Sequence, residues 1–511
     1  MSRSRDSFQI LQEILPGTAF NNDIEYRYFR HFCDDLAKSL SGPFKTELWA
    51  RYIPQTGEME PFVRNAVVAI GALSLEQAED AEDDGHRDQQ KLVKRHETYA
   101  MAKYVKVLED MRIALATETD DPRRALMACL LVFCFESMRG SQHSAALHAS
   151  GGLSLVERLH LEPCFEDKRS RGTGWTGCRN ATTLDEDLYS AYAGLDIQAL
   201  FLIDMRSPAI HQQHKRRMTN VIDNMPDSFD DIQEALEFWR LILRRNFHFI
   251  SIARAKTQAH AAAHDPMPYL SHKKDVETYL GPGNNAWSIN PNGLRLPVSH
   301  PLRAEHARYL KDIQRFHDTA RPILEQHSTP RSDDDHDFYT ASVIRIQMEA
   351  NKINLAYCFF PSAIEWDNYL SSYRIILSLV PALLPYIKSH QHNTSPTRLA
   401  FKIDIGIIAA LSVTVNLCRF KPERDAGLAL FKAIGSYREG VWDSQLAHAL
   451  SKWMVVSEEK WRDANGFIPE ERRLEFEDAD IDIGRRWMLL KGWQGDGSGV
   501  RKVRVENVIT W

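Results

Sequence analysis

The sequence of 511 residues has few cysteines, and none of them form close pairs. The seven cysteines are odd in number and widely spaced, and no two are separated by only two residues. This spacing argues against a disulfide-stapled scaffold and favours reduced thiols in a cytosolic or nuclear protein. Cys129 and Cys134 are nearest to each other in the sequence, and we expect both to be small buried thiols inside an apolar helix. The cysteines are Cys33, Cys129, Cys134, Cys164, Cys178, Cys358 and Cys418.

Long apolar runs and an excess of positive charge are also missing. The longest apolar stretches, Ala125–Phe135, Ile375–Ile387 and Ile405–Leu417, are shorter than the roughly 18 residues that a membrane helix needs. The net charge is −6, from 63 basic and 69 acidic residues, which argues against a protein whose main ligand is nucleic acid. The first residues carry charges without the apolar run of a signal peptide. We therefore expect a soluble protein without a membrane partner.

Apolar residues are numerous enough for a large core. They make up 43% of the chain, and a folded chain of this length buries roughly three quarters of its surface, which excludes a wholly disordered protein. Most segments repeat apolar residues at the helical period, as Val63, Val67 and Ile70 do. The predicted fold class is all-α, a large helical array or bundle with a small C-terminal β-hairpin. The predicted helices are Glu60–Gln77, Arg124–Met138, Leu188–Met205, Asp231–Ala253, His306–Gln326, Ala341–Phe359, Asp367–Ser389, Phe401–Leu417, Pro422–Glu439 and Ser444–Glu459.

Turns, loops and the chain end break this helical pattern. Gly151–Gly152 predicts a turn between two short helices, and Arg485–Trp493 with Val500–Trp511 alternates as a β-hairpin does. The predicted organisation is a tail over 1–20, a helical domain over 21–475 and a β-hairpin extension over 476–511. Polar or loop-rich composition predicts loops over Glu76–Gln89, Leu270–Pro301 and Thr329–Asp337.

No motif in the sequence assembles a catalytic, cofactor-binding or metal-binding set. His260 and His264 are one helical turn apart, but Ala261 stands where zinc-protease chemistry needs a glutamate. The Gly495–Gly499 segment lacks the Gly-Lys-Ser/Thr ending of a phosphate loop and is interpreted as a hairpin turn. We therefore predict no enzyme activity, no cofactor and no metal.

One basic cluster is a candidate nuclear import signal. Lys215, Arg216 and Arg217 follow two histidines in IHQQHKRRM. Short basic clusters of this kind are also common at helix ends, so an ordinary helix surface is the alternative interpretation.

The order of several segments resembles the second type of fungal-specific transcription factor domain. This is the helical regulatory region usually found downstream of a fungal binuclear zinc-cluster DNA-binding motif. The resemblance covers roughly residues 20–475, and its late part includes Arg438, Glu439 and Trp442. The blocks that carry it are Glu25–Gly42, Leu48–Leu73, Arg123–Leu159, Leu195–Leu202, Met225–Trp239 and Phe401–Ser444.

The resemblance implies a helical regulatory domain that acts in the nucleus, with the cytoplasm as a second location. It implies that the pair Arg438 and Glu439 caps or clamps one helix onto another beside Trp442. The DNA-binding module of the family needs six cysteines with close Cys-x2-Cys pairs, and the printed sequence has no such pair. We therefore predict no DNA-binding residues and no direct sequence-specific DNA binding, unless an upstream exon supplies the zinc cluster.

Two functions of different classes follow from these observations. The first is a transcriptional regulator that acts through the transcription machinery or a zinc-cluster factor, with a small-molecule effector, a homodimeric state and control of a biosynthetic gene cluster as further expectations. The second is an enzyme or small-molecule-binding protein on the same helical scaffold, because a fold does not fix a function.

Overall fold

The computed structural model consists mainly of helices, together with two small β-sheets. Most of the described chain is helical, which confirms the all-α prediction. The structure describes residues 20–40, 42, 45–79, 87–116, 122–158, 183–202, 204, 206–264, 301–356, 359, 363–389, 400–482, 485–496 and 502–511. The predicted loop over Leu270–Pro301 lies almost wholly outside these residues.

The helices fall into two groups along the chain. The first group is α1 (Asp23–His31), α2 (Ala37–Leu40), α3 (Ile53–Met59), α4 (Pro61–Glu79), α5 (Arg87–Ala116), α6 (Pro122–Arg139), α7 (Gln142–Arg158) and α8 (Thr183–Leu202), with π-helical turns at Phe32–Leu36 and Leu48–Tyr52. The second group is α9 (Pro208–Asp223), α10 (Ile232–His264), α11 (Pro301–Gln326), α12 (His336–Ala356), α13 (Leu370–Ser389), α14 (Ile408–Leu417), α15 (Lys421–Ile434) and α16 (Ser444–Glu459), with 3-10 turns at Ala363–Tyr369 and Glu470–Arg472.

The strands form two separate three-stranded sheets, which we call sheet A and sheet B. Sheet A contains β1 (Ala400–Lys402), β2 (Tyr437–Glu439) and β3 (Trp442–Asp443), in that order, with a parallel β1–β2 pair and an antiparallel β2–β3 pair. Sheet B contains β4 (Glu475–Asp482), β5 (Trp487–Gly495) and β6 (Lys502–Thr510), all antiparallel.

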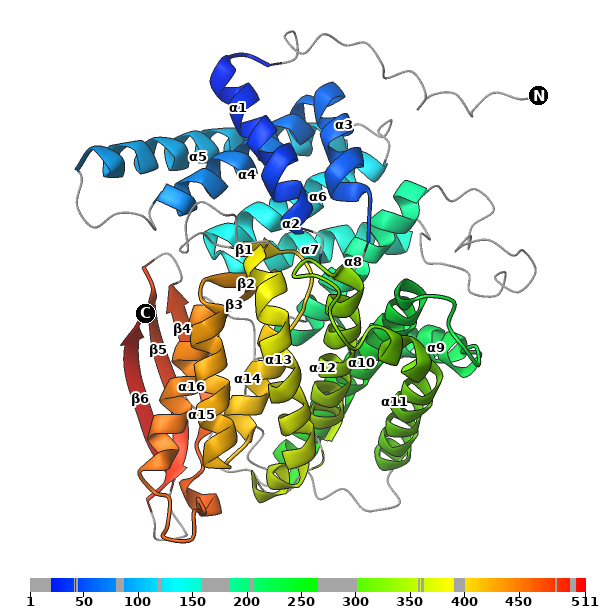
Figure 1. The fold of residues 1–511 in the computed structure, drawn as a ribbon, viewed down its shortest axis with the longest axis vertical. Coiled ribbons are helices and arrows are strands. Elements are labelled where there is room, and N and C mark those ends of the chain that lie inside the picture. Colours follow the sequence, from blue (N-terminus) through cyan, green and yellow to red (C-terminus); the bar gives the residue numbers. More distant parts are fainter. Residues whose placement is uncertain are drawn as a thin grey trace.

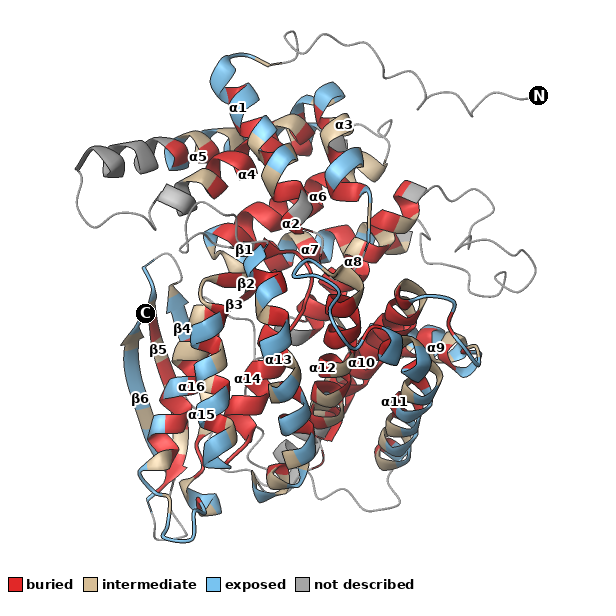
Figure 2. Cartoon of the chain, viewed as in Figure 1, coloured by how far each residue is buried: buried red, intermediate tan, exposed pale blue. Residues whose placement is uncertain are grey.

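The two sheets occupy different places in the molecule (Figure 1). Helices α1–α8 form the upper part, α10, α12 and α13 run through the lower part, and sheet A lies where the two parts meet. Sheet B stands on the outer flank beside α16. Burial follows this layout, because the inner faces of the central helices are buried while α11 and β6 carry many exposed residues (Figure 2).

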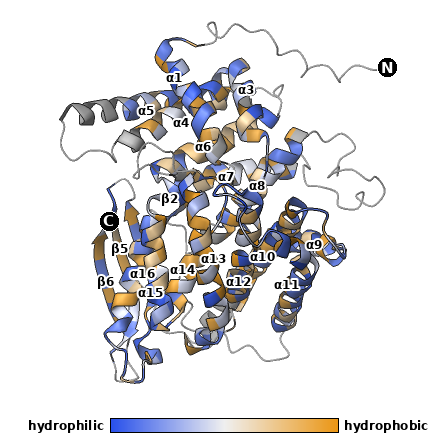
Figure 3. Cartoon of the chain, viewed as in Figure 1, coloured by the Kyte–Doolittle hydropathy of each residue, from blue (hydrophilic) through white to orange (hydrophobic). Residues whose placement is uncertain are grey.

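One apolar core spans both groups of helices, and a second, smaller core lies under sheet B. The large core runs from Tyr28 in α1 to Val455 in α16. The second core joins Trp453 and Met454 of α16 to Met488 and Leu490 of β5. The apolar colouring of these central helices and of sheet B is visible in Figure 3. Sheet B therefore rests on one helix of the larger body.

The strongest helix predictions are confirmed. The nearly all-apolar segment over 124–138 is α6, in which both Cys129 and Cys134 are buried and free. Burial raises the pKa of the Cys129 thiol to about 11, so this thiol is protonated and unreactive at neutral pH. Helix α16 has the predicted bounds, because the Asp443 carboxylate accepts hydrogen bonds from the backbone N–H of Gln445 and Leu446 at 2.9 Å each.

Three local predictions are wrong. Residues 401–407 and 437–439, predicted as parts of helices, instead belong to β1 with its following turn and to β2. The predicted turn at Gly151–Gly152 is absent, since α7 continues through both residues. A Cβ atom on Gly152 would overlap the Tyr192 ring, so this glycine permits close helix packing rather than a turn.

The predicted C-terminal β-hairpin is confirmed as β5 and β6, and β4 adds a strand that the sequence pattern did not predict. Strand β4 has the sequence EFEDADID, whose acidic residues are unusual in strands. It forms because Phe476 and Ala479 reach the core under the sheet while the intervening residues face outward. This sheet begins at Glu475 and packs on α16; the division into domains stays a prediction.

One helical stretch is long and apolar enough to cross a membrane by length and composition. It combines the 3-10 turn Ala363–Tyr369 with α13, over Ala363–Ser389. In this fold Tyr373, Ile376 and Val380 of α13 are buried, and the helix packs against α12, α14 and α15. One face of this helix is therefore part of the core of this fold.

Candidate functional site

The predicted import cluster lies on α9, and the structure separates its three residues. Lys215 is buried, and its Nζ atom is 2.5 Å from Glu305 Oε1 on α11. Arg216 and Arg217 are exposed. The Lys215 ammonium group is therefore turned inward and paired with a carboxylate, unlike the other two members of the predicted cluster. Import through Arg216 and Arg217 stays a prediction.

The two histidines that precede this cluster point into the molecule. His211 Nδ1 is 2.9 Å from His248 Nδ1 of α10, and the ring of His214 stacks on the ring of His248 with centroids 5.0 Å apart. His214 Nε2 is 2.9 Å from Glu157 Oε1 of α7. All three imidazoles are buried. The sequence analysis missed this group, although the spacing of three between His211 and His214 places both on one helix face.

The histidines end a line of buried polar side chains that we call the polar ladder. It consists of Arg240, Arg244 and His248, spaced four residues apart on α10, with Asp196 of α8 and Asp404 beside sheet A. Arg240 forms an ion pair with Asp404 at the upper end. Arg244 Nε donates to Asp196 Oδ2 at 2.9 Å, and His248 Nε2 lies 3.8 Å from the same oxygen.

Arg206 and Arg244 keep Asp196, at the middle of the polar ladder, ionised. Burial alone would raise the pKa of Asp196, but the guanidinium groups of Arg206 and Arg244 hold it well below its usual range. Arg206 Nη1 donates to Asp196 Oδ1 at 2.6 Å, so both carboxylate oxygens are occupied. Asp196 is therefore a permanent buried anion.

The histidines are held neutral at this anion. Burial lowers the pKa of His248 from 6.5 to about 3, against the opposing attraction of Asp196. Burial also lowers the pKa of His211, against the opposing attraction of Asp204. His211 Nε2 lies 3.2 Å from Asp204 Oδ2, which favours a proton on that nitrogen and leaves Nδ1 to accept from His248. Each of the two neutral imidazoles already carries one proton. Acid would therefore have to add a further proton to a buried ring, which burial disfavours.

Two chain segments around sheet A, residues 400–408 and 437–443, bind the two groups of helices together; we call them the seam. The Glu439 carboxylate accepts hydrogen bonds from the backbone N–H of Gly406, Ile407 and Ile408 at 3.0, 2.8 and 2.9 Å. These amides belong to the first residue of α14 and the two residues before it, so Glu439 holds the start of that helix. Burial raises the pKa of Glu439, against the opposing effect of these amides.

Arg438 caps a different helix from Glu439. Its Nη1 atom donates to the backbone oxygen of Met138 at 2.6 Å, at the end of α6, and its Nε atom donates to Asp443 at 2.6 Å. The expected role of these two residues in holding helices together is confirmed. They do it with separate partners rather than as one pair, because neighbouring residues on a strand point to opposite faces.

Gln198 of α8 completes the attachment of the seam. Its Nε2 atom donates to the Ile403 carbonyl at 2.5 Å, and its Oε1 atom accepts from the Val441 N–H at 3.1 Å. Gly440 has a φ of +57°, and a Cβ atom there would overlap the Gln198 carboxamide. The turn between β2 and β3 therefore requires glycine both for its backbone conformation and for space.

Lys402 is the least expected charge in the seam. It is 1% exposed and lies over the rings of Tyr339 and Tyr386, at 5.1 and 4.8 Å from their centroids. Burial lowers its pKa to about 8, against the opposing attraction of Glu439. The aromatic faces stabilise the ammonium group that burial disfavours.

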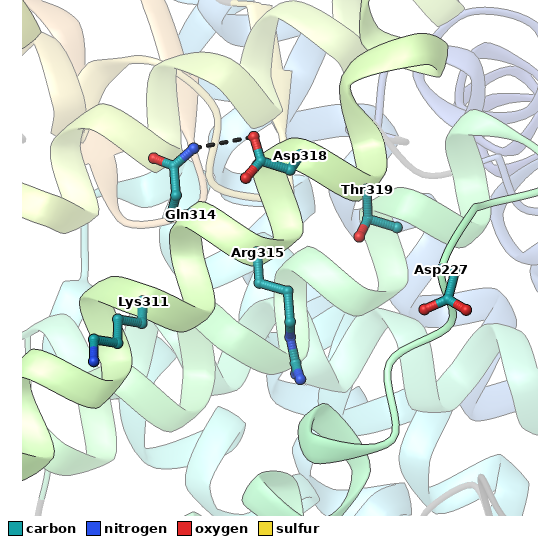
Figure 4. A pocket seen from close by; sticks show the side chains of 6 residues that line it. All are labelled: Asp227, Lys311, Gln314, Arg315, Asp318 and Thr319. Atoms are coloured by element: carbon teal, nitrogen blue, oxygen red, sulfur yellow. Dashed lines mark hydrogen bonds between the residues drawn. The ribbon is translucent and has the colours of Figure 1, made fainter.

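The hollows found differ from the small-molecule pocket expected among the helices. A small, partly open hollow beside Arg240 and Asp404 has a volume of about 20 Å³, which suits one water molecule. A groove of about 510 Å³ lies on the surface between α11 and the loop before α10 (Figure 4). It is open and lined by Asp227, Lys311, Gln314, Arg315, Asp318 and Thr319. Small-molecule sites are usually enclosed and largely apolar, so an effector site stays a prediction.

The candidate metal ligands do not come together in the described part of the chain. Among those residues no group of three or more His, Cys, Asp or Glu side chains is placed to hold a metal ion. His260 and His264 lie at the end of α10, but their side chains are outside the described set, as are Cys164, Cys178 and Cys358. The glycine-rich turn over 495–499 falls mostly outside it as well.

The described residues form a mainly helical fold whose two groups of helices are joined by buried ion pairs and helix caps. Residues 27–230 match the model of the fungal specific transcription factor domain family. The match confirms the family prediction for α1–α9, while the likeness of the later blocks stays a prediction. No curated protein and no solved structure matches the chain.

Proposed function

We propose that this protein regulates transcription in the nucleus by binding protein partners, rather than by reading DNA with its own residues. The observation that carries the proposal is the family match over residues 27–230. The absence of Cys-x2-Cys pairs from the printed sequence and the net charge of −6 support a route through partners. The partner is a zinc-cluster factor or a component of the transcription machinery, and the regulated genes form a biosynthetic cluster.

The seam makes the matched region and the later helices one mechanical unit. Glu439 and Arg438 each cap a helix, and Gln198 of the matched region bonds to both segments of the seam. A partner bound to the upper helices would therefore contact a body that is hydrogen-bonded to the later helices through the seam. This supports a regulatory domain that acts as a whole rather than as a row of separable helices.

A tethering experiment tests the proposal. The full chain is fused to a heterologous DNA-binding domain, and transcription of a reporter carrying its binding site is measured. We expect activation or repression relative to the DNA-binding domain alone. No change in the reporter, with the fusion present in the nucleus at equal abundance, would contradict the proposal.

Nuclear entry is tested separately with the two exposed residues of the basic cluster, Arg216 and Arg217. Alanine at both Arg216 and Arg217 should reduce the nuclear fraction of the tagged chain. Alanine at both Lys421 and Lys432, two exposed lysines of α15, is the matched control and should leave that fraction unchanged. Equal nuclear fractions for both double variants would remove Arg216 and Arg217 from the import route.

A further inference from the structure

Strand β6 leaves one side of sheet B open. It is the last strand in the order β4-β5-β6, and it lies on the outer flank of the molecule (Figure 1). It runs for nine residues, Lys502–Thr510, with no proline, and its ladder to β5 continues through nine consecutive pairs. Val503 and Val508 are 40% and 55% exposed. A long, regular edge strand with exposed valines is a template for another strand.

The backbone groups that face the open side can be assigned from one hydrogen bond. The Trp511 N–H donates to the Arg486 carbonyl at 3.1 Å, which continues the register in which Trp487 faces Thr510. Hydrogen-bonded pairs alternate along an antiparallel ladder, so the odd-numbered residues of β6 bond to β5. The N–H and C=O groups of Arg504, Glu506 and Val508 therefore point outward.

We propose that the open edge of β6 pairs with β6 of a second copy of this chain. The two strands run antiparallel about a two-fold axis at Val505 and join the two sheets into one of six strands. Arg504 of each copy then lies opposite Glu506 of the other, with their outward backbone groups bonded. The inference stands apart from the transcriptional role.

Charge complementarity selects both this occupant and this register. A two-fold axis at Arg504 or at Glu506 would place like charges opposite each other, which is unfavourable. An axis at Val505 pairs opposite charges twice and brings the two Val505 side chains together. Arg504 and Glu506 are about half exposed and lie 3.2 Å apart within one chain, on the sheet face away from α16. Both side chains are therefore able to form ion pairs with a second copy.

The opposite edge of sheet B does not offer the same match. Strand β4 carries Glu475, Glu477, Asp478, Asp480 and Asp482 and has no basic residue. Two copies of β4 would bring acidic residues together in every two-fold register. The self-complementary edge is β6.

Variants that reverse the charge at Arg504, at Glu506 or at both test the proposal in the full chain. The molar mass of the purified protein is measured by light scattering from about 1 to about 100 µM. We expect a monomer–dimer equilibrium for the wild type. Arg504→Glu alone and Glu506→Arg alone should each raise the dimer dissociation constant about tenfold or more, because each places like charges opposite each other at two points. The double variant should return it to within about threefold of the wild type.

Two further variants keep the outcome decisive. Val508→Pro removes an outward N–H without removing a bond to β5, so it should also favour the monomer. Asp480→Arg, on the exposed part of β4, is the control and should leave the dimer intact. A wild type that stays monomeric at about 100 µM, single variants that dimerise like the wild type, or loss of the dimer only in Asp480→Arg would overturn the proposal. Circular dichroism of each variant checks that the fold is retained.

Discussion

Sheet A and sheet B have three strands each but opposite surroundings. Sheet A lies inside the molecule, where Arg438 and Glu439 of β2 cap α6 and α14 and the turn after β2 bonds to Gln198 of α8. Sheet B lies outside, rests on the small core of α16 and leaves β6 open. A three-stranded sheet thus joins two parts of one chain when it is enclosed, and leaves an edge strand without a neighbouring strand when it lies outside.

Strand length explains why each sheet needs its surroundings to a different degree. The strands of sheet A have two or three residues, too few to be stable alone, so side chains from several helices hold them. The strands of sheet B have eight or nine residues with one apolar face, which is close to a self-sufficient unit. Damage to the seam should therefore affect the whole body, and damage to sheet B should stay local.

The largest effect on stability is expected from Glu439→Ala. It leaves the amides of Gly406, Ile407 and Ile408 buried without an acceptor, which should lower the free energy of unfolding by about 4 kcal/mol. Urea denaturation followed by circular dichroism measures it. Glu477→Ala, which removes an exposed ion pair of sheet B, is the matched control. Equal losses in the two variants would break the contrast between the sheets.

The next effect is expected from Gly440→Ala. The positive φ and the overlap with Gln198 should together lower the free energy of unfolding by about 3 kcal/mol. Gly435 also has a positive φ, of +71°, but a Cβ atom there meets open space, so Gly435→Ala should cost about 1 kcal/mol. The difference between the urea midpoints of the Gly440→Ala and Gly435→Ala variants measures the effect of the contact with Gln198. If both variants lose the same stability, the seam does not depend on that contact.

Acid should weaken the side of the molecule that holds the polar ladder. The pKa of His248 is about 3 in the folded chain against an ordinary 6.5, so the unfolded chain takes up the proton first as the pH falls. The contribution of His248 is complete above pH about 6.5 and is lost toward the lower value, by up to about 1.4 kcal/mol per pH unit.

The variant His248→Gln tests this pH dependence. The free energy of unfolding of the variant should fall less steeply than that of the wild type between pH about 6.5 and about 5. His143→Gln, at an exposed position of α7, should keep the slope of the wild type. Residues 475–511 contain no histidine, so sheet B should contribute nothing to this slope. An unchanged slope in His248→Gln would mean that the buried imidazole titrates normally.

The smallest effect is expected from Arg504→Ala in the monomer. Its ion pairs with Glu477 and Glu506 are solvated, so the free energy of unfolding should change by less than about 0.5 kcal/mol. Measurement at low protein concentration separates this value from any effect on dimer formation. A loss above about 1 kcal/mol would show that sheet B depends on its outer face for stability.

The sequence predicted what depends on local periodicity. The bounds of α16 and the burial of α6 follow from the spacing of apolar residues in the sequence, and the structure adds the Asp443 cap at the start of α16. The hairpin β5–β6 follows from strict alternation. These features need no knowledge of distant residues.

The missed features depend on partners far along the chain. Residues 400–402 and 437–439 become strands because they pair with each other, across more than 30 intervening residues. His211 belongs to a buried pair only because α10 brings His248 to it, and Lys215 is turned inward by Glu305. A run of basic residues in a sequence shows how much positive charge is present, but it does not show which of the side chains face solvent and which face the core.

Transcriptional control by this chain is tested most directly by RNA profiling after deletion of the gene. Strains carrying the deletion, the restored wild type and the Glu439→Ala variant are compared under one growth condition. We expect a coordinated change in a set of genes upon deletion, reversal by the wild type and no reversal by a variant with a broken seam. Accumulation of one metabolic intermediate without a coordinated change in transcripts would contradict the regulatory role and favour an enzyme.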